Sequence, residues 1–191
     1  MTAHQAALEA LTRYFGYDSF RPGQQGIVEA LLAGHDVLGV MPTGAGKSVC
    51  YQIPAALSPG ATLVISPLIS LMRDQVDALN DLGLPAAFIN TTQTPDEQAM
   101  VFAQAAAGQI KLLYVAPERL ETGRFRDFAA RTPISLIAVD EAHCVSQWGQ
   151  DFRSSYLGIG DFIAGLPQRP PVGAFTATAT ERVRRDIVGL L

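Results

Sequence analysis

The chain has 191 residues, a length that fits one domain (residues 1–191) with a substantial buried core. Hydrophobic residues make up 48% of it, but no apolar run approaches the roughly 18 residues of a membrane span, so a soluble, cytoplasmic protein is expected. The net charge of −4 argues against tight, nonspecific binding of duplex DNA, and Cys50 and Cys144 have neither zinc-site nor disulfide spacing.

The predicted elements alternate between helices and short apolar strands along the whole chain. Residues 1–16 have an amphipathic helical pattern. Further helical patterns cover residues 47–56, where Pro54 is expected to disturb the helix, residues 68–83, and residues 94–108, which begin with a capping box. The apolar runs lie at residues 36–41, 61–66, 86–90, 110–116, 134–140 and 171–175. Continuous apolar strands separated by helices predict an α/β fold: a doubly wound, mostly parallel sheet with helices on both faces.

Ligands of such a fold gather at the carboxyl ends of the strands, and a glycine-rich stretch follows the first of them. Gly44 and Gly46 allow backbone amides to close on phosphate oxygens at the start of a helix. Lys47 would reach the β- and γ-phosphates, and the Ser48 hydroxyl would bind Mg²⁺. Met41 replaces the first glycine of the standard pattern, but the second half of the loop forms the cradle. An ordinary glycine turn is the alternative interpretation.

An acidic pair, Asp140 and Glu141, ends a later apolar strand. Asp140 is placed to hold Mg²⁺ through water opposite Ser48, and Glu141 to activate the water that attacks the γ-phosphate. Such a pair alone is often a solvated helix start, but together with a phosphate loop it predicts hydrolysis of a nucleoside triphosphate. His143 is ambiguous by itself, since most single histidines are structural.

Asp140-Glu141-Ala142-His143 resembles the DEAH motif of superfamily-two helicases, and residues 42–48 resemble their first motif, for which Met41 is ordinary. Other segments narrow the resemblance, which covers about residues 14–190, to the RecQ family of DNA helicases. It implies a RecA-like P-loop NTPase lobe with ATP and Mg²⁺ as cofactors. The residues expected around the phosphates are Thr43, Gly44, Ala45, Gly46, Lys47, Ser48 and Val49.

Residues 15–24, FGYDSFRPGQ, resemble the adenine-recognition motif of that family. The resemblance implies that Gln24 hydrogen-bonds adenine through its amide while Tyr17 and Arg21 stack on or pack against the base. The alternative is that Tyr17 and Phe20 only anchor the next helix.

Residues 144–157, CVSQWGQDFRSSYL, contain the single tryptophan, Trp148, among polar residues and glycine. An aromatic ring in such surroundings is suited to stacking on unpaired bases. The stretch resembles the aromatic-rich loop of RecQ proteins, which links single-strand binding to ATP hydrolysis. It departs from the family pattern at Gln150 and Ser154, so no role is carried over to these two. The residues carried over are Trp148, Phe152 and Arg153, with Ser146, Gln147 and Asp151 as support.

Four more strand ends carry polar residues without an evident catalytic group. Ser66, Pro67 and Ser70 resemble helicase motif Ia, and residues 114–120 resemble motif Ib. Each is expected to start a helix whose free amides bind single-strand phosphates, although proline is also a routine helix starter. Residues 90–93 are a weaker candidate of this kind. Thr176 and Thr178 resemble motif III, and one of them is expected to hydrogen-bond His143; a simple helix cap is the alternative.

The resemblance implies the first motor lobe of a helicase that moves 3′ to 5′ on DNA, nucleoid-associated if bacterial. Its expected partners are single-stranded DNA, duplex DNA and a second RecA-like lobe that supplies an arginine finger, which Arg182, Arg184 and Arg185 do not match. Alone, the chain is expected to bind Mg-ATP weakly and to hydrolyse it poorly.

Three other functions remain as alternatives. An RNA-remodelling ATPase shares the phosphate loop and the acidic pair, but the adenine motif and the aromatic stretch argue against it. A small-molecule kinase would need a substrate pocket and an arginine-bearing lid, and neither is recognisable in the sequence. A binding module without catalysis is disfavoured because Lys47, Asp140 and Glu141 are all present.

Overall fold

The computed structural model describes residues 1–191 and contains one six-stranded sheet in the order β1-β6-β5-β2-β4-β3. Every neighbouring pair of strands is parallel. The strands are β1 (Val37–Val40), β2 (Ala61–Ile65), β3 (Ala86–Ile89), β4 (Leu112–Val115), β5 (Ile134–Val139) and β6 (Val172–Thr176). Each lies within one of the predicted apolar runs or extends one residue beyond it, and the predicted α/β class is confirmed.

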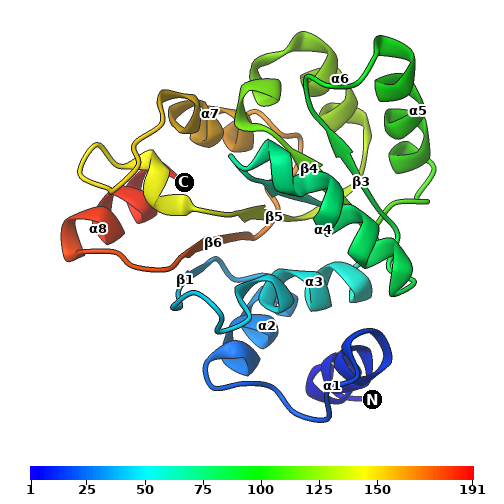
Figure 1. Ribbon diagram of the computed structural model, residues 1–191, viewed down its shortest axis with the longest axis vertical. Coiled ribbons are helices and arrows are strands. Elements are labelled where there is room, and N and C mark those ends of the chain that lie inside the picture. Colours follow the sequence, from blue (N-terminus) through cyan, green and yellow to red (C-terminus); the bar gives the residue numbers. More distant parts are fainter.

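Helices cover both faces of this sheet (Figure 1). The helices are α1 (Ala3–Phe15), α2 (Gln24–Leu32), α3 (Lys47–Leu57), α4 (Ile69–Asp81), α5 (Pro95–Ala106), α6 (Gly123–Arg131), α7 (Ile159–Ala164) and α8 (Glu181–Leu190). Short 3-10 turns are η1 (Pro117–Glu121), η2 (Ala142–Val145) and η3 (Ser154–Gly158). No helix combines the length and the apolar character that crossing a bilayer requires.

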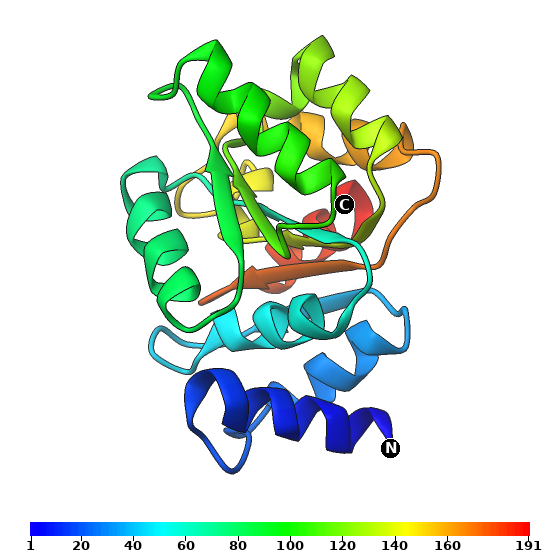
Figure 2. The ribbon, with the colours of Figure 1, turned by 90° about the vertical axis from the view of Figure 1, so that its right-hand side faces the viewer.

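The alternation of side chains along the strands produces two separate cores. Leu63 and Ile65 of β2 face a cluster shared with α5, α6, α7 and α8, whereas Val64 between them faces a cluster shared with α2, α3 and α4. The strands inside the sheet are buried on both faces, which explains why their sequences are apolar without a break. Figure 2 shows the sheet between the two helical layers, with α1 outermost beneath α2 and α3.

Two local predictions about helices need correction. Pro54 lies inside α3, which continues to Leu57, because proline removes only its own N–H bond while the buried Ile53 and Ala55 keep packing. The motif Ib segment starts the 3-10 turn η1 rather than an α-helix, and Thr122 then caps α6 through the Phe125 N–H. The capping box of Thr94 and Glu97 at α5 is confirmed.

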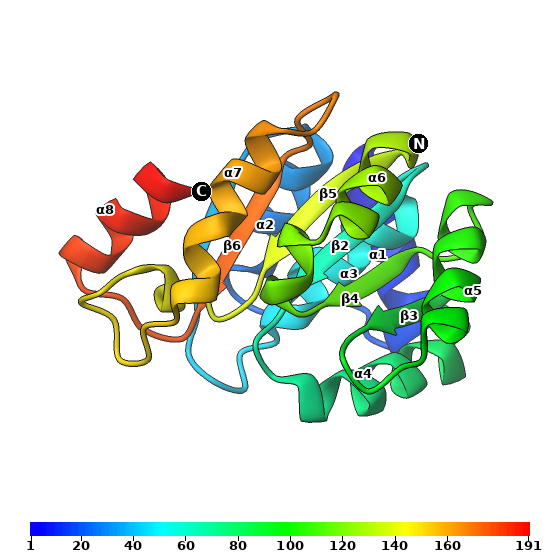
Figure 3. The same cartoon turned by 90° about the horizontal axis from the view of Figure 1, so that it is seen from above.

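The loops that follow β1, β5 and β6 lie at the same edge of the sheet because these strands are parallel neighbours. Seen from above in Figure 3, α8 and α5 lie at opposite ends of the molecule, and the strands run between them. The phosphate loop and the acidic motif are about a hundred residues apart in sequence, and the edge at the carboxyl ends of the strands brings them together.

Candidate nucleotide and nucleic-acid site

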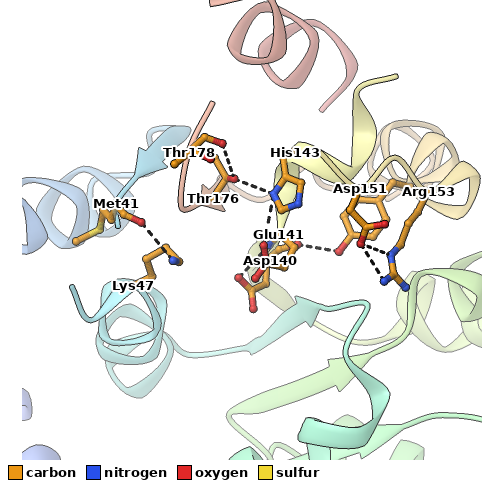
Figure 4. Close-up of polar contacts among 10 residues, drawn as sticks. Met41, Lys47, Asp140, Glu141, His143, Asp151, Arg153, Thr176 and Thr178 are labelled. Carbon is orange, nitrogen blue, oxygen red and sulfur yellow. Dashed lines mark hydrogen bonds and ion pairs between the residues drawn. The ribbon is translucent and has the colours of Figure 1, made fainter. Parts of the chain in front are cut away.

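The phosphate loop, residues 41–48, connects the end of β1 to the first turn of α3. Gly44 and Gly46 have φ values of 85° and 79°, which a residue with a Cβ rarely adopts. The Ala45 N–H donates to the Pro42 carbonyl at 3.1 Å, which closes the turn. Lys47 folds back so that Nζ donates to the Met41 carbonyl at 3.2 Å (Figure 4). The loop thus has the left-handed glycines and the ammonium group that a phosphate cradle requires.

The adenine-motif segment contacts this loop directly. The Arg21 guanidinium donates to the Gly44 carbonyl at 2.8 Å, and the Gln24 amide donates to the Gly46 carbonyl at 2.9 Å. The Arg21 N–H in turn donates to Gln24 Oε1 at 2.8 Å, and Gln24 is 3% exposed. A Cβ on Gly46 would collide with the Gln24 amide, so close packing as well as φ requires glycine there.

The sequence left two roles open for the aromatic residues of this segment, stacking on adenine or anchoring the next helix, and the two residues differ in this respect. Phe20 packs at the edge of the cluster between α1, α2 and α3, which is the anchoring role. Tyr17 is 50% exposed and lies 6.0 Å from the Arg21 guanidinium, so it does not anchor the helix. Tyr17 and Arg21 therefore form an accessible platform beside the phosphate loop.

The acidic motif lies across from Lys47, at the end of β5 (Figure 4). The Asp140 N–H donates to the Ile65 carbonyl of β2 at 2.9 Å, and the Glu141 N–H donates to Asp140 Oδ1 at 2.9 Å. Burial and the neighbouring Glu141 charge raise the pKa of Asp140 to about 6, while the Glu141 N–H, Lys47 and His143 act in the opposite direction. The protein groups around Asp140 therefore do not fully offset the effect of burial and of the Glu141 charge on this carboxylate.

His143 is bonded to the motif III segment, as the sequence predicted. Its Nδ1 lies 2.9 Å from Thr176 Oγ1 and 3.4 Å from Glu141 Oε2. The Thr176 hydroxyl also lies 3.2 Å from the Thr178 carbonyl, so it can donate there when Nδ1 of His143 carries the ring proton. Of the two candidate threonines, Thr176 makes the side-chain bond and Thr178 contributes its main-chain oxygen.

The oxygen atoms around Asp140 suit a hard divalent cation. The Tyr51 hydroxyl is buried without a hydrogen-bond partner, and burial raises its pKa, with Tyr114 and Asp140 acting in the same direction. Ser48 follows Lys47 in the first turn of α3, and Asp140 lies across from Lys47 (Figure 4). No group of three or more His, Cys, Asp or Glu side chains could enclose a metal ion by itself. This sparse set fits Mg²⁺, which keeps waters and takes phosphate oxygens as ligands.

The aromatic loop, residues 144–157, places Trp148 in solvent at 60% exposure, and Phe152 is 37% exposed. Arg153 forms an ion pair with Asp151 at 3.0 Å. The buried Ser146 accepts from the Trp148 N–H at 3.2 Å. Gln147 is exposed. His143 and Trp148 line one cleft of about 360 Å³, so the acidic motif and the aromatic ring face the same space.

Three residues of this region had no signal in the sequence. The Arg182 guanidinium lies 3.8 Å from the centroid of the Trp148 ring, and Asp186 accepts from the Ser146 hydroxyl at 2.6 Å. Both belong to α8, which begins 24 residues after the end of the loop. Tyr156 donates its hydroxyl to the Asp140 carbonyl at 2.8 Å. Only the folded chain brings these residues together, because no local pattern records a contact between distant segments.

The motif Ia and neighbouring segments are more buried than a phosphate-binding role by side chains would require. Ser66 is 2% exposed and accepts from the Leu68 N–H at 3.3 Å, whereas Ser70, in the first turn of α4, is exposed and Pro67 is half-buried. Asn90 is also buried and accepts from the Thr92 N–H at 2.9 Å. These side chains shape turns, which leaves Ser70 and the free amides of α4 as the accessible groups.

A polar pocket of about 330 Å³ lies beside the motif Ib segment. Arg119 and Arg124 line it together with Gln93 and Gln98, and Nε of Arg119 is buried without a hydrogen-bond partner. Two guanidinium groups in one pocket make this a positive site on a protein whose net charge is −4.

Comparison with known proteins places this geometry in a wider context. Residues 21–187 match the family model "DEAD/DEAH box helicase". The chain is 50% identical over 182 residues to the "ATP-dependent DNA helicase RecQ" of Haemophilus influenzae, covering 95% of this chain and 29% of that protein. It is 47% identical over 182 residues to the RecQ helicase of Bacillus subtilis, covering 95% of this chain and 31% of that protein. The chain thus spans under a third of the length of these curated relatives.

Solved structures agree on the fold. A hypothetical ATP-dependent RNA helicase from Sulfolobus tokodaii superposes with a TM-score of 0.72 at 21% identity, over 98% of this chain and 54% of that one. The Pyrococcus furiosus Hef helicase domain superposes with a TM-score of 0.69 at 21% identity, over 90% of this chain and 36% of that one. At this identity the likeness establishes the fold alone.

Proposed function

Because the chain belongs to the DEAD/DEAH box helicase family, and within it to the RecQ helicases, we propose that it is the motor lobe that binds Mg-ATP and couples its hydrolysis to movement on DNA. The observation that carries this proposal is the meeting of Lys47 with Asp140, Glu141 and His143 at one edge of the sheet, from segments about a hundred residues apart. An ammonium group, two carboxylates and an imidazole around one space are the groups that phosphoanhydride hydrolysis needs.

Nucleotide binding follows from the phosphate loop and the segment packed on it. The amides at the start of α3 and the Lys47 ammonium hold the phosphates. The base lies on the side of Tyr17 and Arg21. The Gln24 amide donates to the Gly46 carbonyl at 2.9 Å and reaches the Ala45 carbonyl at 3.5 Å, which leaves one lone pair of Oε1 for adenine. Because Arg21 and Gln24 also bond the loop carbonyls, contact with the base is transmitted to the phosphate site through Gly44 and Gly46. Thr43, Ala45 and Val49 supply main-chain contacts along the same path.

Hydrolysis requires a carboxylate that can accept a proton from water, and Glu141 has this role. Ser48 and Asp140 would hold Mg²⁺, which would supply positive charge to neutralise the phosphates. Asp140 orients the motif through the Glu141 N–H. His143 is hydrogen-bonded to Thr176 and lies near Glu141, so it connects the acid to motif III. Nucleotide state is thereby linked to the segment that follows β6.

The nucleic-acid partner is proposed to be DNA, bound first as a single strand. Trp148 and Phe152 offer rings for stacking, and Arg153, oriented by Asp151, offers a cation beside them. Ser66, Pro67 and Ser70 place the amides of α4 on the same edge, and the pocket with Arg119 and Arg124 extends the phosphate path. The curated relatives are named DNA helicases, which favours DNA over RNA as the partner.

A complete helicase of this kind would unwind duplex DNA with a second RecA-like lobe, in the cytoplasm and, in a bacterium, on the nucleoid. That lobe would supply an arginine finger, which contributes about 10³–10⁵ in rate in P-loop enzymes. We therefore expect weak Mg-ATP binding and slow turnover from this chain alone.

The test is an ATPase assay on the chain with no nucleic acid, with single-stranded DNA and with RNA of matched sequence. Measurable Mg-ATP binding, slow turnover and stimulation by DNA rather than RNA are expected. Stimulation by RNA alone would favour an RNA-remodelling ATPase. Product formation that depends on a nucleoside monophosphate would favour a kinase, and failure to bind adenine nucleotides would refute the proposal.

A further inference from the structure

The backbone at Glu141 is the one place where a residue other than glycine has a positive φ. Its φ of 50° and ψ of 44° lie in the left-handed region, which long side chains avoid because Cβ crowds the neighbouring carbonyl. Such a conformation persists only where surrounding contacts enforce it. What enforces it here is relevant to hydrolysis, since the same residue carries the proposed catalytic carboxylate.

The peptide unit between Asp140 and Glu141 is held at both ends. Its N–H donates to Asp140 Oδ1 at 2.9 Å, and its carbonyl accepts from the Tyr156 hydroxyl at 2.8 Å. The first contact comes from within the motif, so Tyr156 is the contact from outside it. Tyr156 is 0% exposed and is packed in the core cluster beneath β5, which prevents its hydroxyl from swinging away.

Turning this peptide unit over would return Glu141 to a negative φ, because the rotation changes ψ of Asp140 and φ of Glu141 together. That rotation would take the carbonyl away from Tyr156 and leave a buried hydroxyl without a partner, which is unfavourable.

We propose that Tyr156 is a positioning residue for Glu141: its hydroxyl holds the Asp140 carbonyl in the orientation that keeps Glu141 left-handed and its carboxylate in place for the attacking water. The inference rests on the proposed role of Glu141 in ATP hydrolysis. Tyr156 belongs to η3, in the last part of the aromatic loop. A movement of that loop therefore reaches the catalytic acid through a single hydrogen bond.

The first test is the kinetics of Tyr156→Phe, which removes one oxygen atom and keeps the ring. We expect kcat for ATP to fall about 10- to 100-fold, the cost of misplacing a catalytic group by about an ångström, while KM for ATP stays within about twofold. Tyr14→Phe is the control for the loss of a tyrosine hydroxyl, because Tyr14 is half-buried in α1 and takes no part in the proposed site. An unchanged kcat in Tyr156→Phe, or an equal loss in Tyr14→Phe, would overturn the inference.

The second test measures the strained backbone without any nucleotide. Asparagine tolerates the left-handed region better than glutamine, so Glu141→Asn should unfold at a higher temperature than Glu141→Gln in the wild-type background. In the Tyr156→Phe background the peptide is free to turn, and this advantage should disappear. An advantage that persists there would mean that Tyr156 does not impose the conformation.

The two tests separate this inference from the proposed function. If Glu141→Gln leaves ATP turnover unchanged, the catalytic role of Glu141 is wrong, whatever the melting temperatures show. If Glu141→Gln abolishes turnover but Tyr156→Phe does not reduce it, the proposed function stands and the positioning role of Tyr156 is wrong.

Discussion

The nucleotide side and the nucleic-acid side of the proposed site are built in different ways. The phosphate loop depends on main-chain geometry, with left-handed Gly44 and Gly46 and carbonyls bound by Arg21 and Gln24. The aromatic loop instead presents side chains, with Trp148 largely in solvent and held from α8. A main-chain site depends on its glycines more than on the side chains around it, whereas a site made of side chains depends on each of them.

Lys47 is the exception on the nucleotide side, and its removal should have the largest effect. We expect Lys47→Ala to reduce ATP turnover by about 10²–10³-fold, because one preorganised positive group facing the phosphates is lost. Steady-state kinetics would measure this. Lys111→Ala is the matched control, since the second lysine donates to the Ser58 carbonyl at 2.7 Å, at the opposite end of the sheet. Equal losses in both variants would contradict a local role for Lys47.

Trp148→Ala should weaken binding on the nucleic-acid side and leave the nucleotide side unchanged. Stacking of one base on an aromatic ring contributes about 1–3 kcal/mol, so single-stranded DNA should bind roughly 10- to 100-fold more weakly while KM for ATP is unchanged. Fluorescence anisotropy of a labelled oligonucleotide measures the affinity. Trp148→Phe should retain most of it. A large change in ATP affinity with Trp148→Ala would remove the distinction between the two sides.

Arg182→Ala tests whether α8 covers the tryptophan ring. A cation 3.8 Å from the ring centroid shields one face and contributes about 0.5–1 kcal/mol at an exposed site. Because Trp148 is the only tryptophan, its fluorescence reports this contact without labelling. Quenching by acrylamide should increase in Arg182→Ala and stay at the wild-type level in Arg185→Ala, whose side chain pairs with Glu181 at 3.8 Å. Equal quenching in both variants would show that Arg182 does not shield the ring.

Asp36→Asn lies outside both regions and should have the smallest effect. Burial raises the pKa of Asp36, but the Arg169 hydrogen bonds and the Val172 N–H outweigh it, so the pKa is below its ordinary value of 3.8. Because its pKa is lowered in the folded state, the Asp36 carboxylate stabilises the fold above pH 4. This stabilisation is lost as the pH falls through the folded-state pKa. Since the pair is about half exposed, the loss at pH 7 should be about 0.2–1 kcal/mol.

Thermal unfolding at several pH values would measure this effect. The difference in stability between Asp36→Asn and the wild type should be present at neutral pH and shrink below pH 4. A difference that stays constant into strong acid would mean that the carboxylate charge is not its source. ATP turnover at neutral pH should be the same in both proteins, because the contact between Asp36 and Arg169 belongs to neither the nucleotide side nor the nucleic-acid side.

The elements of the nucleotide side could be predicted because each depends on a short stretch of chain. The apolar run before Met41, the glycines and the helix start at Lys47 follow one another directly, and the acidic pair follows another apolar run. The bond between His143 and Thr176 could also be predicted, but from the family resemblance rather than from spacing. Pro54 was misjudged, because the packing of a buried helix outweighed the loss of one hydrogen bond.

The sequence by itself determined the class of fold, the phosphate loop and the identity of the acids, since apolar periodicity and glycine conformations act over a few neighbouring residues. Only the tertiary structure decided that Arg182 covers Trp148, that Asp186 bonds Ser146 and that Tyr156 bonds the Asp140 carbonyl. These contacts depend on how α8 and η3 pack beside β5 and β6. Packing of distant segments leaves no periodic trace along the chain, because it is set by the shapes of all the buried side chains together.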